Sequence, residues 1–170
     1  MSYYEYTVPQ FIRILGQAKV WLDKAETHAT NKSFAADTLL TARLAPNQFA
    51  FARQIQILTD NTKGAAARLA GVQPPPFADD EKTITELRAR IDKTIAFLET
   101  LTPAQFEGAA ERPITLPFWA GKAMTGADYL TRFALPNLYF HAVTAYAILR
   151  HNGVDIGKTD FLGDIPLYDV

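Results

Sequence analysis

The sequence predicts an all-α fold, a four-helix bundle forming a single domain over residues 1–170. Four long stretches carry apolar residues at steps of three and four, the period of an amphipathic helix. The proline-rich stretch VQPPPFADDE cannot be helical and forms a crossover, and the helical period fails in a longer connection between residues 103 and 126. With 170 residues, 48% of them hydrophobic, the chain can bury one substantial core without a second domain.

The first two helices are marked by residues that favour helix ends. Thr7 is a suitable N-cap for a helix that tolerates Pro9 in its first turn and ends near Asn31. Pro46 stands where a second helix can begin, and Gly71 is placed to end it. The apolar stripes of the two helices include Val8, Phe11, Ile12, Leu15, Ala18, Leu22 and Ala25, and then Phe51, Ala52, Ile55, Leu58, Ala65 and Leu69.

The third helix follows the crossover. Thr83 and Glu86 have the spacing of a capping box, in which each side chain satisfies the other residue's backbone N–H. Glu86 with Arg90, and Arg88 with Asp92, are spaced as exposed ion pairs one helical turn apart. This segment is therefore expected to be an ordinary amphipathic helix with a charged outer face.

The insertion before the last helix has a different pattern. The stretch ERPITLPFWAGKAM, residues 111–124, combines β-branched and aromatic residues around Ala120 and Gly121, which favours a short hairpin. Thr125 and Asp128 then resemble the cap of a brief helix that runs through Phe133.

The last main helix is predicted to begin at Pro136 and to run through Asn152, where Gly153 closes it. The tail after it is too apolar to stay in water, so we expect it to pack on the bundle. Its apolar residues are Ile156, Phe161, Leu162, Ile165, Leu167 and Tyr168.

The composition excludes several classes of function. Lys and Arg number 17 against 18 Asp and Glu, and they are spread along the chain, so no nucleic-acid footprint is present. Cysteine is absent, which removes disulfides, thiolate ligands and cysteine nucleophiles. The start MSYYEYTVPQFIRIL has no signal-peptide pattern, and no stretch of the chain approaches the roughly eighteen apolar residues of a membrane-spanning helix. We therefore expect a soluble, cytoplasmic protein without membrane contact.

Histidines are the main candidates for chemistry, because the usual phosphate-loop, nucleophile-elbow and metalloprotease motifs are missing. His141 shares a helix face with Leu138, Ala145 and Ile148, so its ring is expected inside the bundle. A shielded, neutral imidazole can bind a metal, accept a proton, or donate one structural hydrogen bond. The sequence leaves these three roles open.

The remaining candidates lie around His141. His28, on the flank of the first helix, can line a pocket or cap the last turn, whereas the position of His151 at a helix end gives it no site role. Several aromatic residues crowd the region between the insertion and the last helix, either as core or as the lining of a pocket. They are Phe118, Trp119, Tyr129, Phe133, Tyr139, Phe140 and Tyr146.

The last third of the chain resembles the closing helix of the DinB/YfiT-like superfamily of four-helix bundles. That helix has the pattern H-x-x-x-H, a Leu-Arg pair and Gly, and this chain has Asn137-x-x-x-His141, then Leu149, Arg150 and Gly153. Three blocks covering residues 43–57, 63–72 and 136–163 resemble a bacterial family of unknown function within that superfamily.

The resemblance implies a four-helix bundle that is commonly dimeric and that in several members binds nickel or zinc through three histidines. Characterised relatives include thiol-dependent transferases and isomerases. His141 matches the second histidine of the motif, but Asn137 replaces the first, and the predicted second helix holds no histidine. Gln48 can face inward there, although an amide is a poor ligand for zinc or nickel.

We therefore predict no metal site and no cofactor, since a nickel or zinc ion would need a further ligand such as His28 or Asp60. The leading hypothesis is a bundle whose former metal pocket is kept as a small-ligand or structural cavity, with Asn137, His141, Gln48 and His28 as candidate ligand-binding residues. One alternative is a thiol-dependent transferase or isomerase in which His141 is the general base, oriented by Asn137. The other is a homodimeric interaction or structural protein.

Overall fold

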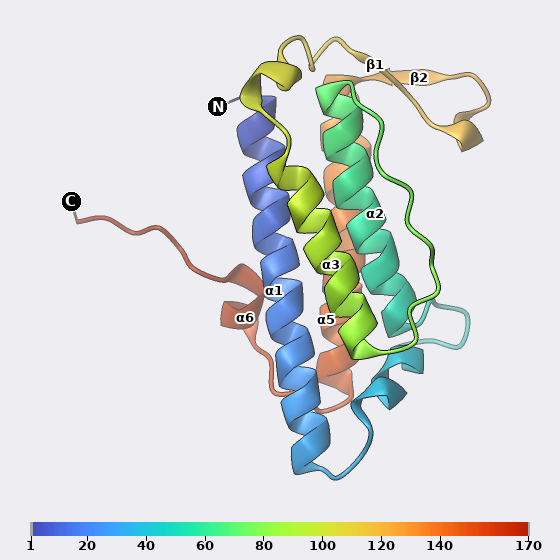
Figure 1. Ribbon diagram of the computed structural model, residues 1–170, viewed down its shortest axis with the longest axis vertical. Coiled ribbons are helices and arrows are strands. Elements are labelled where there is room, and N and C mark those ends of the chain that lie inside the picture. The colour runs from blue at the N-terminus through green and yellow to red at the C-terminus, as the bar shows by residue number, and fades with distance from the viewer. Residues whose placement is uncertain (1, 170) are drawn as a thin grey trace.

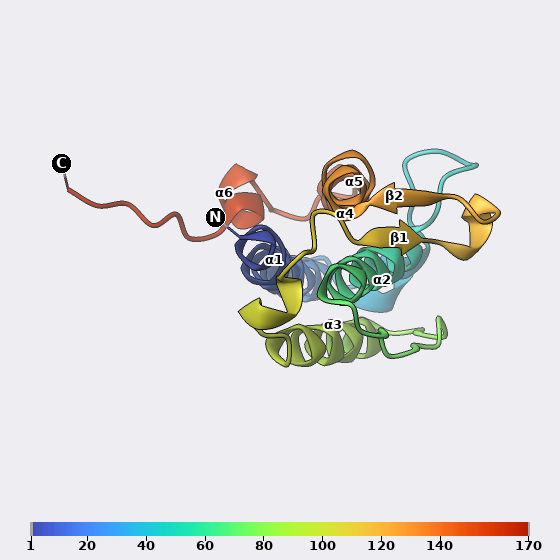
Figure 2. The same cartoon turned by 90° about the horizontal axis from the view of Figure 1, so that it is seen from above.

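Four long helices form the bundle within residues 2–169, which are the residues that the computed structural model describes. They are α1 (Tyr3–Asn31), α2 (Phe51–Ala70), α3 (Ile84–Glu99) and α5 (Leu135–His151). In Figure 1, α2 and α3 run in the same direction and α1 and α5 run in the opposite one. Seen from above, α3 and α5 lie on opposite sides of the α1–α2 pair (Figure 2). The predicted all-α four-helix bundle is confirmed.

α1 begins five residues earlier than the sequence pattern predicts. Ser2 is the N-cap, and its hydroxyl accepts from Glu5 N while the Glu5 carboxylate accepts from Ser2 N. Thr7 is therefore an interior residue, and its hydroxyl donates to the Tyr3 carbonyl at 2.7 Å. Pro9 lies inside the helix, and because it has no N–H it cannot donate to the Glu5 carbonyl one turn earlier.

α2 begins at Phe51, five residues after Pro46. The Phe51 N–H donates to the Ala42 carbonyl at 2.9 Å, so the chain folds back before the helix starts. Gly71 ends the helix in the left-handed conformation, at φ 73°, as predicted. Gln48 consequently lies in the loop before α2 and not on the helix.

The crossover from Val72 to Lys82 joins two helices that run in parallel, which is why a long connection is needed here (Figure 1). The capping box of α3 is present, since Thr83 and Glu86 exchange both hydrogen bonds. The two predicted ion pairs within α3 are wrong. Glu86 is engaged in the cap, Arg88 contacts two carboxylates of α1, and Arg90 is buried.

The predicted hairpin is present as strands β1 (Pro113–Thr115) and β2 (Ala123–Thr125), paired antiparallel with Ile114 opposite Met124. Ala120 and Gly121, both at positive φ, make the turn between them. The hairpin extends sideways over one end of the bundle, beside α2 and α5 (Figure 2). Short 3-10 turns also connect the helices at Ala36–Thr41, Pro103–Phe106 and Pro117–Trp119.

The helix after the hairpin is continuous with α5. Thr125 caps α4 (Gly126–Asp128), and a π-helical turn, Tyr129–Ala134, leads directly into α5. α5 itself begins at Leu135, one residue before the predicted start, and Pro136 lies in its first turn. The difference from the prediction is that the chain before Leu135 is already helical.

The tail after α5 packs on the bundle only in part. The short helix α6 (Lys158–Leu162) lies against α1, where Trp21 donates to the Asp160 carbonyl at 2.8 Å and Phe161 stacks on the Trp21 ring at 5.4 Å. Beyond it the chain extends away from the bundle (Figure 1). The prediction is wrong for Ile165, Leu167 and Tyr168, which are exposed because no surface of the described residues covers them. No helix in residues 2–169 has the length and apolar character needed to cross a membrane.

Candidate functional site

His141 lies in the interior between α2 and α5, with only 7% of its surface exposed. Its Nδ1 is 2.7 Å from Oε1 of Gln54 on α2, and the ring of Phe140 lies edge-on to the imidazole at 5.2 Å. Gln54 is itself 1% exposed. The orienting hydrogen bond of His141 thus comes from a residue that the sequence analysis did not select, and not from Asn137.

The hydrogen bonds of Gln54 define the state of His141. Gln54 Nε2 donates to the Phe49 carbonyl at 3.0 Å, so its Oε1 faces the imidazole. An amide oxygen only accepts, and therefore Nδ1 of His141 carries the proton and Nε2 holds the lone pair. Burial lowers the pKa of His141, and the positive charge of Arg53 lowers it further, so the ring is neutral at pH 7.

Two of the predicted site residues lie elsewhere. Gln48 is in the loop before α2, and its buried Oε1 has no hydrogen-bond partner among the described residues. His28 packs edge-on against Phe34 and lines a separate hollow with Lys24 and Asp155 near the other end of α1. The structure thus does not join either residue to His141.

Asn137, one helical turn before His141, lines an open hollow of about 170 Å³. The hollow lies where α2, the hairpin and the π-turn meet, and His141 is not among its lining residues. The lining residues are Ile57, Asp60, Asn61, Arg68, Leu116, Phe118, Tyr129, Phe133 and Asn137. We call this feature the Asn137 hollow.

The Asn137 hollow contains polar groups that are not fully paired. Nδ2 of Asn61 is buried and has no hydrogen-bond partner within residues 2–169. Arg68 donates to the Tyr129 hydroxyl over a long 3.4 Å. Burial raises the pKa of Tyr129 despite the nearby Arg68 charge, so the phenol stays neutral at physiological pH. Unpaired buried donors are costly in a stable protein, which makes this hollow a candidate binding site.

Aromatic rings form one wall of the hollow. Tyr129 and Phe133, one turn apart on the π-turn, stack at 5.7 Å, and Trp119 lies edge-on to Phe133 at 5.4 Å. Phe118 completes the wall and is 71% exposed. These residues belong to the aromatic cluster that the sequence indicated, and the hairpin brings them over the helices.

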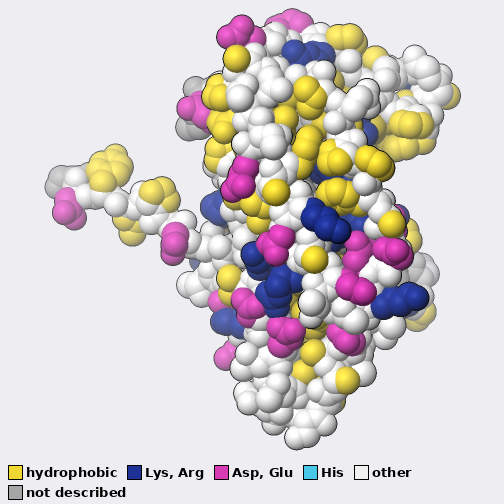
Figure 3. All heavy atoms as spheres, in the orientation of Figure 1, with side chains coloured by type: hydrophobic (Ala, Val, Ile, Leu, Met, Phe, Trp, Pro, Cys, Tyr) yellow, Lys and Arg dark blue, Asp and Glu magenta, His cyan; other side chains and the backbone are white. Residues whose placement is uncertain are grey.

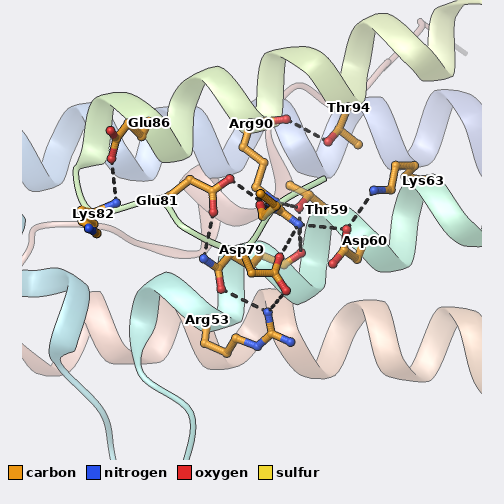
Figure 4. Close-up of polar contacts among 12 residues, drawn as sticks. Arg53, Thr59, Asp60, Lys63, Asp79, Glu81, Lys82, Glu86, Arg90 and Thr94 are labelled. Carbon is orange, nitrogen blue, oxygen red and sulfur yellow. Dashed lines mark hydrogen bonds and ion pairs between the residues drawn. The ribbon is translucent and has the colours of Figure 1, made fainter. Parts of the chain in front are cut away.

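A buried ion network lies on the other side of α2, under the crossover (Figure 4). Arg90 of α3 is 2% exposed and pairs at 2.9 Å with each of Asp60, Asp79 and Glu81. Arg90 Nε also donates to the Thr59 hydroxyl at 2.6 Å. Together these contacts tie the crossover to α2 and α3.

A hollow of about 310 Å³ adjoins this network, lined by Phe77, Glu81, Glu86 and Arg90 among others. Its central polar groups are already paired, since Arg90 binds Glu81 and the Glu86 carboxylate caps α3. On the face shown in Figure 3, acidic and basic side chains are interspersed and not segregated by sign. We therefore assign this region a structural role.

The residues beside His141 do not fit a nickel or zinc site. Within residues 2–169, no group of three His, Cys, Asp or Glu side chains is arranged to hold a metal ion. The side chain bonded to His141 is the amide of Gln54, and the position of the other motif histidine is held by the amide of Asn137. Amides are weak ligands for these metals. The donor set thus lacks the imidazoles that the superfamily resemblance implies.

The fold and this region define the class of the protein. A crystal structure of a DinB family member protein from Shewanella denitrificans is 44% identical, with a TM-score of 0.95, and the match covers 98% of this chain and 95% of that chain. The class is therefore that of the DinB-like four-helix bundles. Residues 3–162 match the model of DUF1993, a domain of unknown function, and the chain belongs to that family. A comparison with curated proteins gives no match.

Proposed function

We propose that this protein is a metal-independent DinB-like bundle that binds a small organic molecule in the Asn137 hollow. The observation that carries the proposal is the Asn61 side chain, which belongs to a residue lining the same hollow as Asn137 and whose buried Nδ2 has no hydrogen-bond partner among the described residues. A bound acceptor atom would satisfy this donor. The aromatic wall supplies the apolar contact that small-molecule sites need.

The proposal is tested by a fragment screen followed by NMR. We expect fragments that bind in the hollow to shift the side-chain amide signals of Asn61 and Asn137. The substitution Asn61→Leu should weaken the binding of these fragments. Asn152→Leu is the matched control, because Asn152 lies at the far end of α5 and donates to the Ile148 carbonyl. Stoichiometric metal in protein purified without added metal, or fragments that shift neither amide, would overturn the proposal.

A second candidate is an enzyme in which His141 is the general base toward a thiol or hydroxyl. It is favoured by the hydrogen bond from Nδ1 to Gln54, which leaves Nε2 unprotonated, and by the lowered pKa, which keeps the ring neutral. If His141→Ala leaves every activity found by substrate screening unchanged, this role is excluded. Loss of activity with retained folding supports it.

A third candidate is a homodimer that pairs through the outer face of α5. Tyr139, Phe140 and Val143 are 40%, 58% and 51% exposed and follow one another along this face. An exposed apolar stripe on one helix suits pairing with the same stripe of a second copy about a two-fold axis. The mass in solution tests it: we expect a dimer that Val143→Glu dissociates, whereas a monomer at high micromolar concentration would exclude it.

A further inference from the structure

Arg68 is a cation without a counterion in the part of the chain that the structure describes. It lines the Asn137 hollow, and its hydrogen bond within residues 2–169 is the long one to the Tyr129 hydroxyl. The neighbouring arginines differ, since Arg53 and Arg90 both bind Asp79 and Arg90 also binds Asp60. The positive charge of Arg68 beside the hollow is thus not compensated by a carboxylate of the described residues.

The carboxylate of Asp60, which also lines the hollow, does not neutralise Arg68. Its Oδ1 is held at 2.9 Å by Arg90 and at 3.0 Å by Lys63. The network as a whole is balanced, because Arg53, Lys63 and Arg90 face the three carboxylates of Asp60, Asp79 and Glu81. It therefore leaves no net negative charge for Arg68. The free electrostatic character of the hollow is positive, and an anion is the ligand group that it favours.

Gly64 leaves room for the Arg68 side chain. A Cβ added at Gly64 would collide with the Arg68 guanidinium, which folds back along α2. Glycine in the middle of a helix costs about 1 kcal/mol relative to alanine. This position of Arg68 therefore depends on a residue that the helix alone does not favour.

The other donors around the hollow suit a planar acceptor. Asn61 Nδ2 is buried without a partner, Asn137 contributes a second amide, and the phenol of Tyr129 is neutral and can donate. A guanidinium fork binds a carboxylate through two parallel hydrogen bonds. Neutral donors next to one arginine can satisfy the remaining lone pairs.

The size and walls of the hollow limit the rest of the ligand. An apolar protein cavity of about 150 Å³ holds one benzene molecule. The hollow measures about 170 Å³ and has Phe118, Tyr129 and Phe133 along one side. The space inside the hollow therefore accommodates one flat ring or an apolar group of similar size.

We propose that the Asn137 hollow binds a small monocarboxylate with a flat apolar body, whose carboxylate pairs with Arg68 and Asn61. This inference rests on the proposed ligand-binding function and adds the chemical class of the ligand. The carboxylate would lie between the guanidinium and the two amides, and the ring would lie against Tyr129 and Phe133.

The test uses the full chain with benzoate as the probe and benzamide as its uncharged analogue. We expect benzoate to bind, to shift the Asn61 side-chain amide signal, and to bind roughly tenfold or more tightly than benzamide, because a charged hydrogen bond is lost with the amide. Arg68→Gln should lower the affinity for benzoate by a similar factor and leave the affinity for benzamide unchanged. Arg132→Gln, an exposed arginine on the π-turn that pairs with Asp128, is the charge-matched control and should change neither.

The outcomes separate this inference from the proposed function. If benzamide or another neutral fragment binds the hollow as well as benzoate does, and Arg68→Gln has no effect, the binding site remains and the carboxylate preference is wrong. Inorganic phosphate that binds at least as tightly as benzoate also overturns the preference for a planar carboxylate. If no fragment of any charge shifts the Asn61 amide, both proposals fail together.

Discussion

His141 and Gln54 form a buried hydrogen bond of 2.7 Å that joins α5 to α2 across 87 residues of sequence. The amide is fixed in turn by its bond to the carbonyl of Phe49, in the loop just before the same helix. The pair therefore joins the two helices, while a neutral imidazole stays in place with its Nε2 unprotonated. The same arrangement serves a structural role and a general-base role, so the variants below separate the stability of the pair from any activity.

Gln54→Leu should destabilise the protein by about 1–3 kcal/mol, because it leaves the buried His141 Nδ1–H without an acceptor. Urea denaturation measures the change in the free energy of unfolding. Gln48→Leu is the matched control: the Gln48 Oε1 is already buried without a partner, so its removal should be neutral or stabilising. Equal losses for the two variants would show that the bond to His141 contributes nothing specific.

The stability of the protein should fall as the pH drops below about 6.5, the pKa of an unfolded histidine. Burial and the charge of Arg53 lower the pKa of His141 in the folded state. Between the two pKa values the unfolded chain binds more protons than the folded one, so the free energy of unfolding rises with pH. The contribution of neutral His141 is fully present above about pH 6.5 and is lost as the pH falls toward the folded-state pKa. Because a single proton is involved, the free energy of unfolding changes by at most about 1.4 kcal/mol per pH unit.

His141→Gln should flatten this pH dependence between pH 7 and 5, measured as the urea midpoint at each pH. His28→Gln should keep it, because that substitution leaves His141 and Gln54 in place. An unchanged slope in His141→Gln would assign the acid sensitivity to another group.

Arg90→Leu should destabilise the protein by about 2–3 kcal/mol. The substitution leaves Asp60, Asp79 and Glu81 without their shared cation, and breaking a buried pair by removing one partner costs about 3–5 kcal/mol, less here because Asp60 and Asp79 are over a third exposed. Arg88→Leu is the control on the same helix. Its partners are exposed carboxylates of α1, and such pairs contribute at most about 1 kcal/mol.

A loss of stability in Arg90→Leu no larger than that in Arg88→Leu would contradict the structural role of the network.

The network also affects the titration of Asp79. Burial alone raises the pKa of that carboxyl, but the hydrogen bond and charge of Arg53, together with Arg90, hold it below its usual value. Its contribution to stability is therefore present above about pH 3.8 and is lost as the pH falls further.

The helices could be predicted because their signals are local. A period of three to four, the Thr83–Glu86 capping box and Gly71 after α2 are each contained in a short window of sequence. The start of α1 was misplaced because Ser2 and Thr7 are both acceptable caps, and the reciprocal bonds with Glu5 decide between them. The apolar residues of the tail similarly do not show where the chain leaves the bundle.

The site was less predictable because its partners come from distant segments. The spacing of Arg90 suggested a pair with Glu86, yet Arg90 binds carboxylates on α2 and the crossover. Gln54 lies on the inward stripe, between Phe51 and Leu58, so its burial follows from the pattern. Its contact with His141 does not, because that depends on how far α2 is shifted along α5.

Gly64→Ala should displace Arg68 and weaken benzoate binding, with little net change in stability. An alanine gains up to about 1 kcal/mol in a helix interior, but the new Cβ collides with the Arg68 guanidinium, which must rotate away from its place beside the hollow. Gly16→Ala is the control on α1, where a Cβ meets nothing within 4 Å. It should stabilise by about 0.5–1 kcal/mol and leave benzoate affinity unchanged. Titration with benzoate, under conditions in which both variants are equally folded, measures the difference in affinity. Equal affinities would mean that anion binding in the hollow does not depend on the position of Arg68.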